Sequence, residues 1–152
     1  ASTVTIANMQ ISTNGAEPGI YWGDGGANDA NASTGKLLNC FVRGAWYAAT
    51  GSEGTIGITV DGSSFGPIIQ GCYIWGWGTG IDVSDGASRT AYGVHILGIN
   101  ITVSTCGILV ANNTFGCAVP AIDSADLNYW VGNTAVTAEA GSELLAIEME
   151  AF

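Results

Sequence analysis

Residues 69–74 read Ile69-Gln70-Gly71-Cys72-Tyr73-Ile74, with an aliphatic residue two places before a glycine and another three places after it. The same pattern, with Asn or Gly in the third place, recurs at 6–11, 37–42, 96–101 and 131–136. These copies begin roughly 30 residues apart, an interval typical of repeat architectures. A further match at 110–115 lies too close to its neighbours to begin a separate repeat.

Asn and Gly are the residues that most readily adopt a left-handed backbone conformation, so the pattern predicts two short strands joined by a sharp bend. A second element, Gly-Ile followed by two residues of which the second is apolar, occurs at 19–22, 57–60, 80–83 and 107–110. Each repeat therefore holds at least two short strands, and helical periodicity is almost absent before residue 137. The segment 137–152 is consistent with either a short helix or a final strand.

Short strands that repeat at this interval without intervening helices are typical of a solenoid with parallel stacking. The bend and the Gly-Ile strands resemble the right-handed parallel β-helix family, the pectate-lyase-like fold of polysaccharide lyases, pectin hydrolases, and phage tailspike and other virion proteins. The resemblance implies an all-β domain at 1–141 with about five coils, followed by a C-terminal cap or interface segment at 142–152. An immunoglobulin-like sandwich is the alternative, but its strands do not require Asn or Gly at one fixed offset.

Stacked repeats would place equivalent residues in inward columns. The first column is Met9, Cys40, Cys72, Ile99 and Thr134, and the second is Ile11, Val42, Ile74, Ile101 and Val136. Cys40 and Cys72 would then be neighbours on strands about 4.8 Å apart, a spacing compatible with a disulfide. The alternative is two buried thiols that pack as small apolar residues.

The aromatic residues predict an outward surface. If Ile74 faces inward, Tyr73, Trp75 and Trp77 alternate onto the outer face. The preceding repeat would place Phe41 beside Tyr73 and Arg43 beside Trp75, with a cation–π contact in the second pair. Trp46 and Tyr47 would lie at the edge of this surface. Such a surface is typical of a subunit interface or a glycan platform, unless a loop at 45–52 covers it.

Enzymes with the fold that this sequence resembles use clustered carboxylates and a basic residue on the outer face. The nearest candidates for an acid/base group here are Asp82 and Asp85, with Arg89 and His95 on the following segment. However, Asp82 alternates with inward residues, and Asp85-Gly86 has the form of a turn. The paired-aspartate, His-Gly and Arg-x-Lys motifs of the related hydrolases are missing, so the sequence favours a protein without catalysis.

The composition of the chain argues against several kinds of partner and ligand. The 152 residues carry 13 acidic and 3 basic groups, a net charge of -10, and 47% hydrophobic residues. This acidity argues against a nucleic-acid partner and against anionic membranes. Asp24 and Asp29 are calcium candidates in a Gly- and Asn-rich loop, but their spacing matches no EF-hand. We expect no cofactor, no membrane-spanning helix, and a signal segment that is absent or already removed.

These features favour a structural component of an extracellular or viral assembly, such as a homotrimeric capsid decoration protein, spike or fibre. Its partners would be further copies and other assembly or capsid proteins. The alternative is a secreted carbohydrate-active protein, either a lyase or hydrolase or a glycan-binding module that uses Tyr73, Trp75 and Trp77. A third hypothesis is a surface protein of a salt-adapted organism, which the low charged fraction of 11% disfavours.

Overall fold

The computed structural model describes the backbone of part of the chain, namely residues 3–13, 18–23, 34–44, 54–61, 66–83, 91–110, 114–115, 117–125, 134–138 and 144–149. Side chains are described for 3–13, 18–23, 34–44, 56–61, 66–83, 93–101 and 107–109. Every regular element in these ranges is a strand. A helix long and apolar enough to cross a membrane is therefore not found among them. The all-β expectation is confirmed for the described residues.

The strands vary from two to sixteen residues in length. They are β1 (Thr3–Ala7), β2 (Gln10–Ser12), β3 (Ile20–Trp22), β4 (Thr34–Leu38), β5 (Phe41–Arg43), β6 (Gly54–Val60), β7 (Ile68–Gln70), β8 (Tyr73–Val83), β9 (Ala91–Tyr92), β10 (His95–Val110), β11 (Thr114–Phe115), β12 (Cys117–Ala125), β13 (Thr134–Ala138) and β14 (Leu144–Met149).

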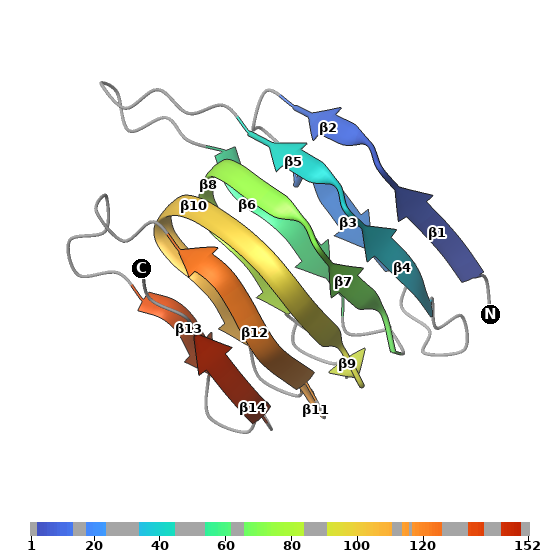
Figure 1. Cartoon of the computed structure of the whole chain (residues 1–152), viewed down its shortest axis with the longest axis vertical. Coiled ribbons are helices and arrows are strands. Elements are labelled where there is room, and N and C mark those ends of the chain that lie inside the picture. The colour runs from blue at the N-terminus through green and yellow to red at the C-terminus, as the bar shows by residue number, and fades with distance from the viewer. Residues whose placement is uncertain are drawn as a thin grey trace.

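All of the strand pairs among the described residues are parallel; β9 and β11 form a separate two-stranded sheet, and the other strands form three ladders. The first ladder runs β1, β4, β7, the start of β10, β12 and β14. The second runs β2, β5, the start of β8, the middle of β10 and the end of β12. The third runs β3, β6, the ends of β8 and β10, and β13. The long strands β8 and β10 link the ladders, so the sheet curls into a half-barrel with β1 and β14 at opposite edges (Figure 1).

Four bends separate the first ladder from the second. Asn8, Asn39, Gly71 and Gly98 have φ angles of 55°, 51°, 63° and 53°, as the repeat predicts. Backbone hydrogen bonds at the bends keep neighbouring strands in register. The backbone N–H of Asn39 donates to the Gln70 carbonyl at 2.9 Å, and the N–H of Gly71 donates to the Leu97 carbonyl at 3.0 Å. The fifth predicted bend residue, Asn133, lies outside the described residues.

The core consists of aliphatic rows that run across the strands. Ile6, Leu37, Ile69 and Ile96 form one row before the bend. Ile11, Val42, Ile74 and Ile101 form the predicted column after it, and Ile20, Ile58, Ile81 and Ile108 form a row in the third ladder. Most of these side chains are fully buried, and each contributes about 1.5–3 kcal/mol of transfer free energy.

Two predictions about the columns are wrong. Met9, the residue before β2, is 55% exposed, because β2 is an edge strand that pairs, among the described strands, with β5 alone. Thr134 and Val136 pair with Cys106 and Ile108 in the third ladder and do not extend the columns of the bend. The two columns are continued instead by β12, where Ile122 pairs with Ile99 and Ala125 pairs with Ile101, so the match at 131–136 does not mark a fifth repeat of the same kind.

The C-terminal segment contains a strand. The sequence allowed either a short helix or a final strand over 137–152, and residues 144–149 form β14. This strand pairs in parallel with β12, with Val119 opposite Ile147. It therefore extends the first ladder at the edge opposite β1 (Figure 1).

Candidate functional surface

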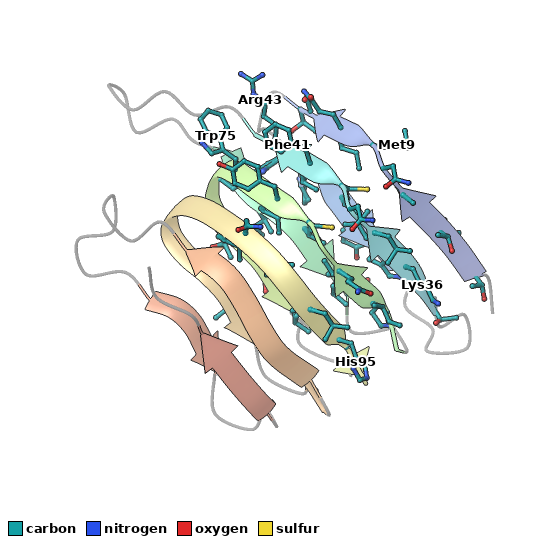
Figure 2. The ribbon with its side chains drawn as sticks, viewed as in Figure 1. Met9, Lys36, Phe41, Arg43, Trp75 and His95 are labelled. Carbon is teal, nitrogen blue, oxygen red and sulfur yellow. The ribbon has the colours of Figure 1, made fainter. Side chains whose placement is uncertain are left out.

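The predicted aromatic pairs are present in the second ladder. Phe41 is in register with Tyr73, and Arg43 with Trp75. The Phe41 and Tyr73 ring centroids are 5.1 Å apart with planes at 12°, and Arg43 Cζ lies 5.5 Å from the centroid of Trp75. Both contacts match the sequence expectation. Figure 2 shows the labelled side chains Phe41, Arg43 and Trp75 together at one end of the second ladder.

The stacking of Phe41 on Tyr73 fixes how the rings meet solvent. Two parallel rings with centroids 5.1 Å apart are offset-stacked, so each ring covers one face of the other. On the far sides, Gln10 is in register with Phe41 and Asn100 with Tyr73. Tyr73 is 41% exposed, and the stacking leaves each ring of the pair with at most one uncovered face.

Basic side chains lie on the same outer side of the curled sheet. Lys36 and His95 are exposed in the first ladder and flank Ile68, which pairs with both of them. Arg43 is exposed in the second ladder. We refer to Lys36, Phe41, Arg43, Tyr73, Trp75 and His95 together as the basic-aromatic face. Figure 2 shows its labelled members along the outer layer of strands.

The segments that build the basic-aromatic face contain no carboxylate. Residues 3–13, 34–44, 66–79 and 93–101 contain neither Asp nor Glu, although the chain has 13 acidic residues. Gln70, Gln10 and Asn100 are the polar neutral residues within it, and half-buried Leu38 and Leu97 separate its two ladders. The face is therefore apolar and weakly positive on a chain whose net charge is -10.

Trp77 does not belong to this face, which corrects the sequence prediction. Its side chain is fully buried, and Nε1 donates to the Val42 carbonyl at 3.2 Å. The reason is Gly76, whose φ of 81° interrupts the alternation of β8 at the point where its pairing with β10 shifts register. The sequence signal for this inversion was the glycine between two tryptophans.

Three glycines surround the indole of Trp77. A Cβ at Gly19 or at Gly44 would lie 2.8 Å from ring atoms, and one at Gly57 would lie 3.1 Å away. Side chains at these positions would overlap the ring, so their absence makes room for the largest residue of the core. These glycines have a packing role that the repeat pattern did not reveal.

The third ladder carries the acidic groups of the described side chains. Tyr21, Thr59 and Asp82 form one outward row, and the Tyr21 hydroxyl donates to Asp61 Oδ2. Asp61 is only 5% exposed, and its backbone N–H donates to the Trp22 carbonyl at 2.8 Å. Asp61 is not among the site residues that the sequence predicted. Its partner Tyr21, forty residues earlier in the chain, gave no local signal.

The catalytic candidates are not brought together where the structure describes them. Asp82 pairs with Leu109 near the end of β10, whereas His95 is the first residue of that strand. The two side chains therefore belong to different ladders. Asp85 and Arg89 lie outside the described residues, as do the calcium candidates Asp24 and Asp29. Within the described part of the chain, no group of three or more His, Cys, Asp or Glu could hold a metal ion.

Cys40 and Cys72 are buried free thiols at equivalent places beside the bends. Cys40 Sγ donates to the Leu38 carbonyl at 3.3 Å, and Cys72 Sγ donates to the Gln70 carbonyl at 3.4 Å. Burial raises the pKa of the Cys72 thiol. In the structure both residues therefore pack as small apolar side chains, the second of the two alternatives that the sequence left open.

Comparison with protein-family models, curated proteins and solved structures finds no match to this chain.

Proposed function

We propose that this chain is a non-enzymatic structural component of an extracellular or viral assembly, such as a capsid decoration or cement protein, a spike or a fibre. The observation that carries the proposal is the basic-aromatic face. Interface cores are enriched in Tyr, Trp, Phe and Arg and depleted of carboxylates, and this face has that composition. Its rigid pairs, Phe41 on Tyr73 and Arg43 over Trp75, resemble the clustered anchors that dominate binding energy.

We further propose that the curled sheet is a right-handed parallel β-helix of about five coils, with residues 142–152 as a cap or interface segment. The three parallel ladders and the left-handed Asn and Gly bends support this architecture. Such a stack leaves edge strands at its ends, and Val4 of β1 is 50% exposed. Contact with neighbouring subunits, in a homotrimer within a virion or extracellular structure, would cover surfaces of this kind.

The test is the mass of the protein in solution as a function of concentration, measured by light scattering after size exclusion. We expect a stable oligomer. In the double variant Tyr73→Ser, Trp75→Ser, the dissociation constant of the oligomer should be at least about tenfold higher, because the variant loses two anchors of the face and keeps the core. Far-UV circular dichroism serves as the folding control. A wild-type chain that stays monomeric at every concentration would contradict the proposal.

A glycan-binding or carbohydrate-active role is the second candidate, favoured by the exposed Tyr73 and the half-buried Trp75. It makes different predictions. A monomer that binds a neutral or acidic polysaccharide with loss of affinity on Trp75→Ala, or that releases unsaturated uronides, would support it. The stacking of Phe41 on Tyr73 covers one face of each ring, which weighs against stacking of a sugar on this pair.

A further inference from the structure

We propose that the basic-aromatic face binds the acid-bearing surface of a second copy of this chain. This inference rests on the proposed assembly function and names the partner of that surface. The first step is the distribution of charge. Two of the three Lys and Arg residues, Lys36 and Arg43, and the single histidine, His95, lie on the face. All 13 acidic residues lie outside the segments that build it.

The second step concerns the shape of the contact. If two such faces met, Lys36 and Arg43 of one copy would approach their equivalents in the other, which disfavours a symmetric contact. A contact between the basic-aromatic face and an acidic surface pairs opposite charges. Contacts between two different surfaces form rings when the rotation closes, so this arrangement is compatible with a cyclic trimer.

The third step is the rigidity of the face. Arg43 is held over the Trp75 ring and Phe41 is stacked on Tyr73, so little side-chain freedom remains to be lost on binding. An arginine held over an aromatic ring can still donate hydrogen bonds to a carboxylate, and Arg43 Cζ lies 5.5 Å from the Trp75 centroid. A carboxylate of the partner copy that reaches Arg43 would therefore meet a preorganised site.

Gln70 offers a sharp test because it is exposed and lies between Leu38 and Leu97, in the centre of the face. We compare Gln70→Glu with Gln70→Lys, two substitutions of similar size and opposite charge. Association is measured by analytical ultracentrifugation at several salt concentrations. Gln70→Glu should weaken association about tenfold, and Gln70→Lys should leave it equal or stronger. Association of the wild type should also weaken as salt increases.

The outcomes separate this inference from the proposed function. If the wild type and both variants form the oligomer equally well, the inference is wrong and the assembly role stands. The same holds if association of the wild type becomes stronger as salt increases. A wild-type monomer overturns both. Binding of an acidic polysaccharide to a monomer, weakened by Gln70→Glu, overturns the inference in favour of the glycan-binding candidate. Near-UV circular dichroism of the buried Trp77 confirms that each variant is folded.

Discussion

At the scale of single residues, the bend between the first two ladders depends on a conformation that few side chains accept. Asn39 has a φ of 51° and its N–H donates to the Gln70 carbonyl. Its side-chain oxygen also occupies the space that a Cβ at Gly71 would need. Gly71 therefore has no side chain at the place where the Asn39 side chain of the neighbouring bend lies over its backbone.

This bend can be tested with two substitutions at one position. Asn39→Ala should lower the free energy of unfolding by about 1–2 kcal/mol, because the left-handed region is sterically unfavourable for alanine. Asn39→Gly should cost only a few tenths, because glycine adopts this conformation freely. Urea unfolding followed by circular dichroism measures both. Equal losses for the two variants would show that the Asn39 amide, and not the backbone conformation, stabilises the bend.

At the scale of elements, β8 contains two tryptophans with opposite environments only two residues apart. Trp77 is fully buried against Gly19, Gly44 and Gly57, whereas Trp75 lies half-buried under Arg43. Gly76 separates them with its left-handed backbone. The strand therefore contributes to the core and to the basic-aromatic face through neighbouring positions.

We expect Trp77→Ala to destabilise the protein by about 3–5 kcal/mol, because it leaves a large cavity and an unpaired Val42 carbonyl. The matched control Trp75→Ala should cost about 1 kcal/mol or less, because that ring is partly in solvent. Gly44→Ala should cost about 1–3 kcal/mol through overlap with the Gly76 carbonyl and with the indole. Chemical denaturation at low protein concentration measures all three. Similar losses for the two tryptophans would contradict the opposite orientations.

The sequence predicted much of the second ladder but less of the rest. The bend pattern identified the positions of Asn8, Asn39, Gly71 and Gly98, and the alternation that follows them paired Phe41 with Tyr73 correctly. Alternation failed at Trp77, because one left-handed glycine shifts every later side chain to the other face. The acidic pair of Tyr21 and Asp61 was missed because its partners come from different strands and follow no local pattern.

The predicted fifth repeat shows that a local sequence pattern does not determine which strand a segment pairs with. The pattern at 131–136 has the right residues, yet β13 pairs with the end of β10 and not with its beginning. The strand that continues the first ladder, β12, begins at Cys117 without an aliphatic-Asn/Gly motif. A six-residue pattern specifies local conformation, whereas the partner of a strand depends on where the connecting chain returns.

At the scale of the whole molecule, strand ladders that contact only their neighbours should unfold from their ends. In repeat architectures, stability is a sum of local terms and nearest-neighbour interfaces, so an edge opens more often than the middle. Three equivalent amides report this directly. The N–H groups of Asn8, Asn39 and Gly71 donate to the Leu38, Gln70 and Leu97 carbonyls at 3.0, 2.9 and 3.0 Å.

Because these three hydrogen bonds are alike, any difference in the protection factors of the three amides, which correct for intrinsic exchange, reflects the position of the strand and not the bond itself. We expect the protection factor of the Asn8 amide, at the β1 edge, to be roughly 10²-fold lower than that of Gly71, with Asn39 between them. Native-state hydrogen exchange by NMR, on protein dilute enough to be monomeric, gives the three rates. Equal protection factors would mean that the chain opens as one cooperative unit, and the additive description of the ladders would then be wrong.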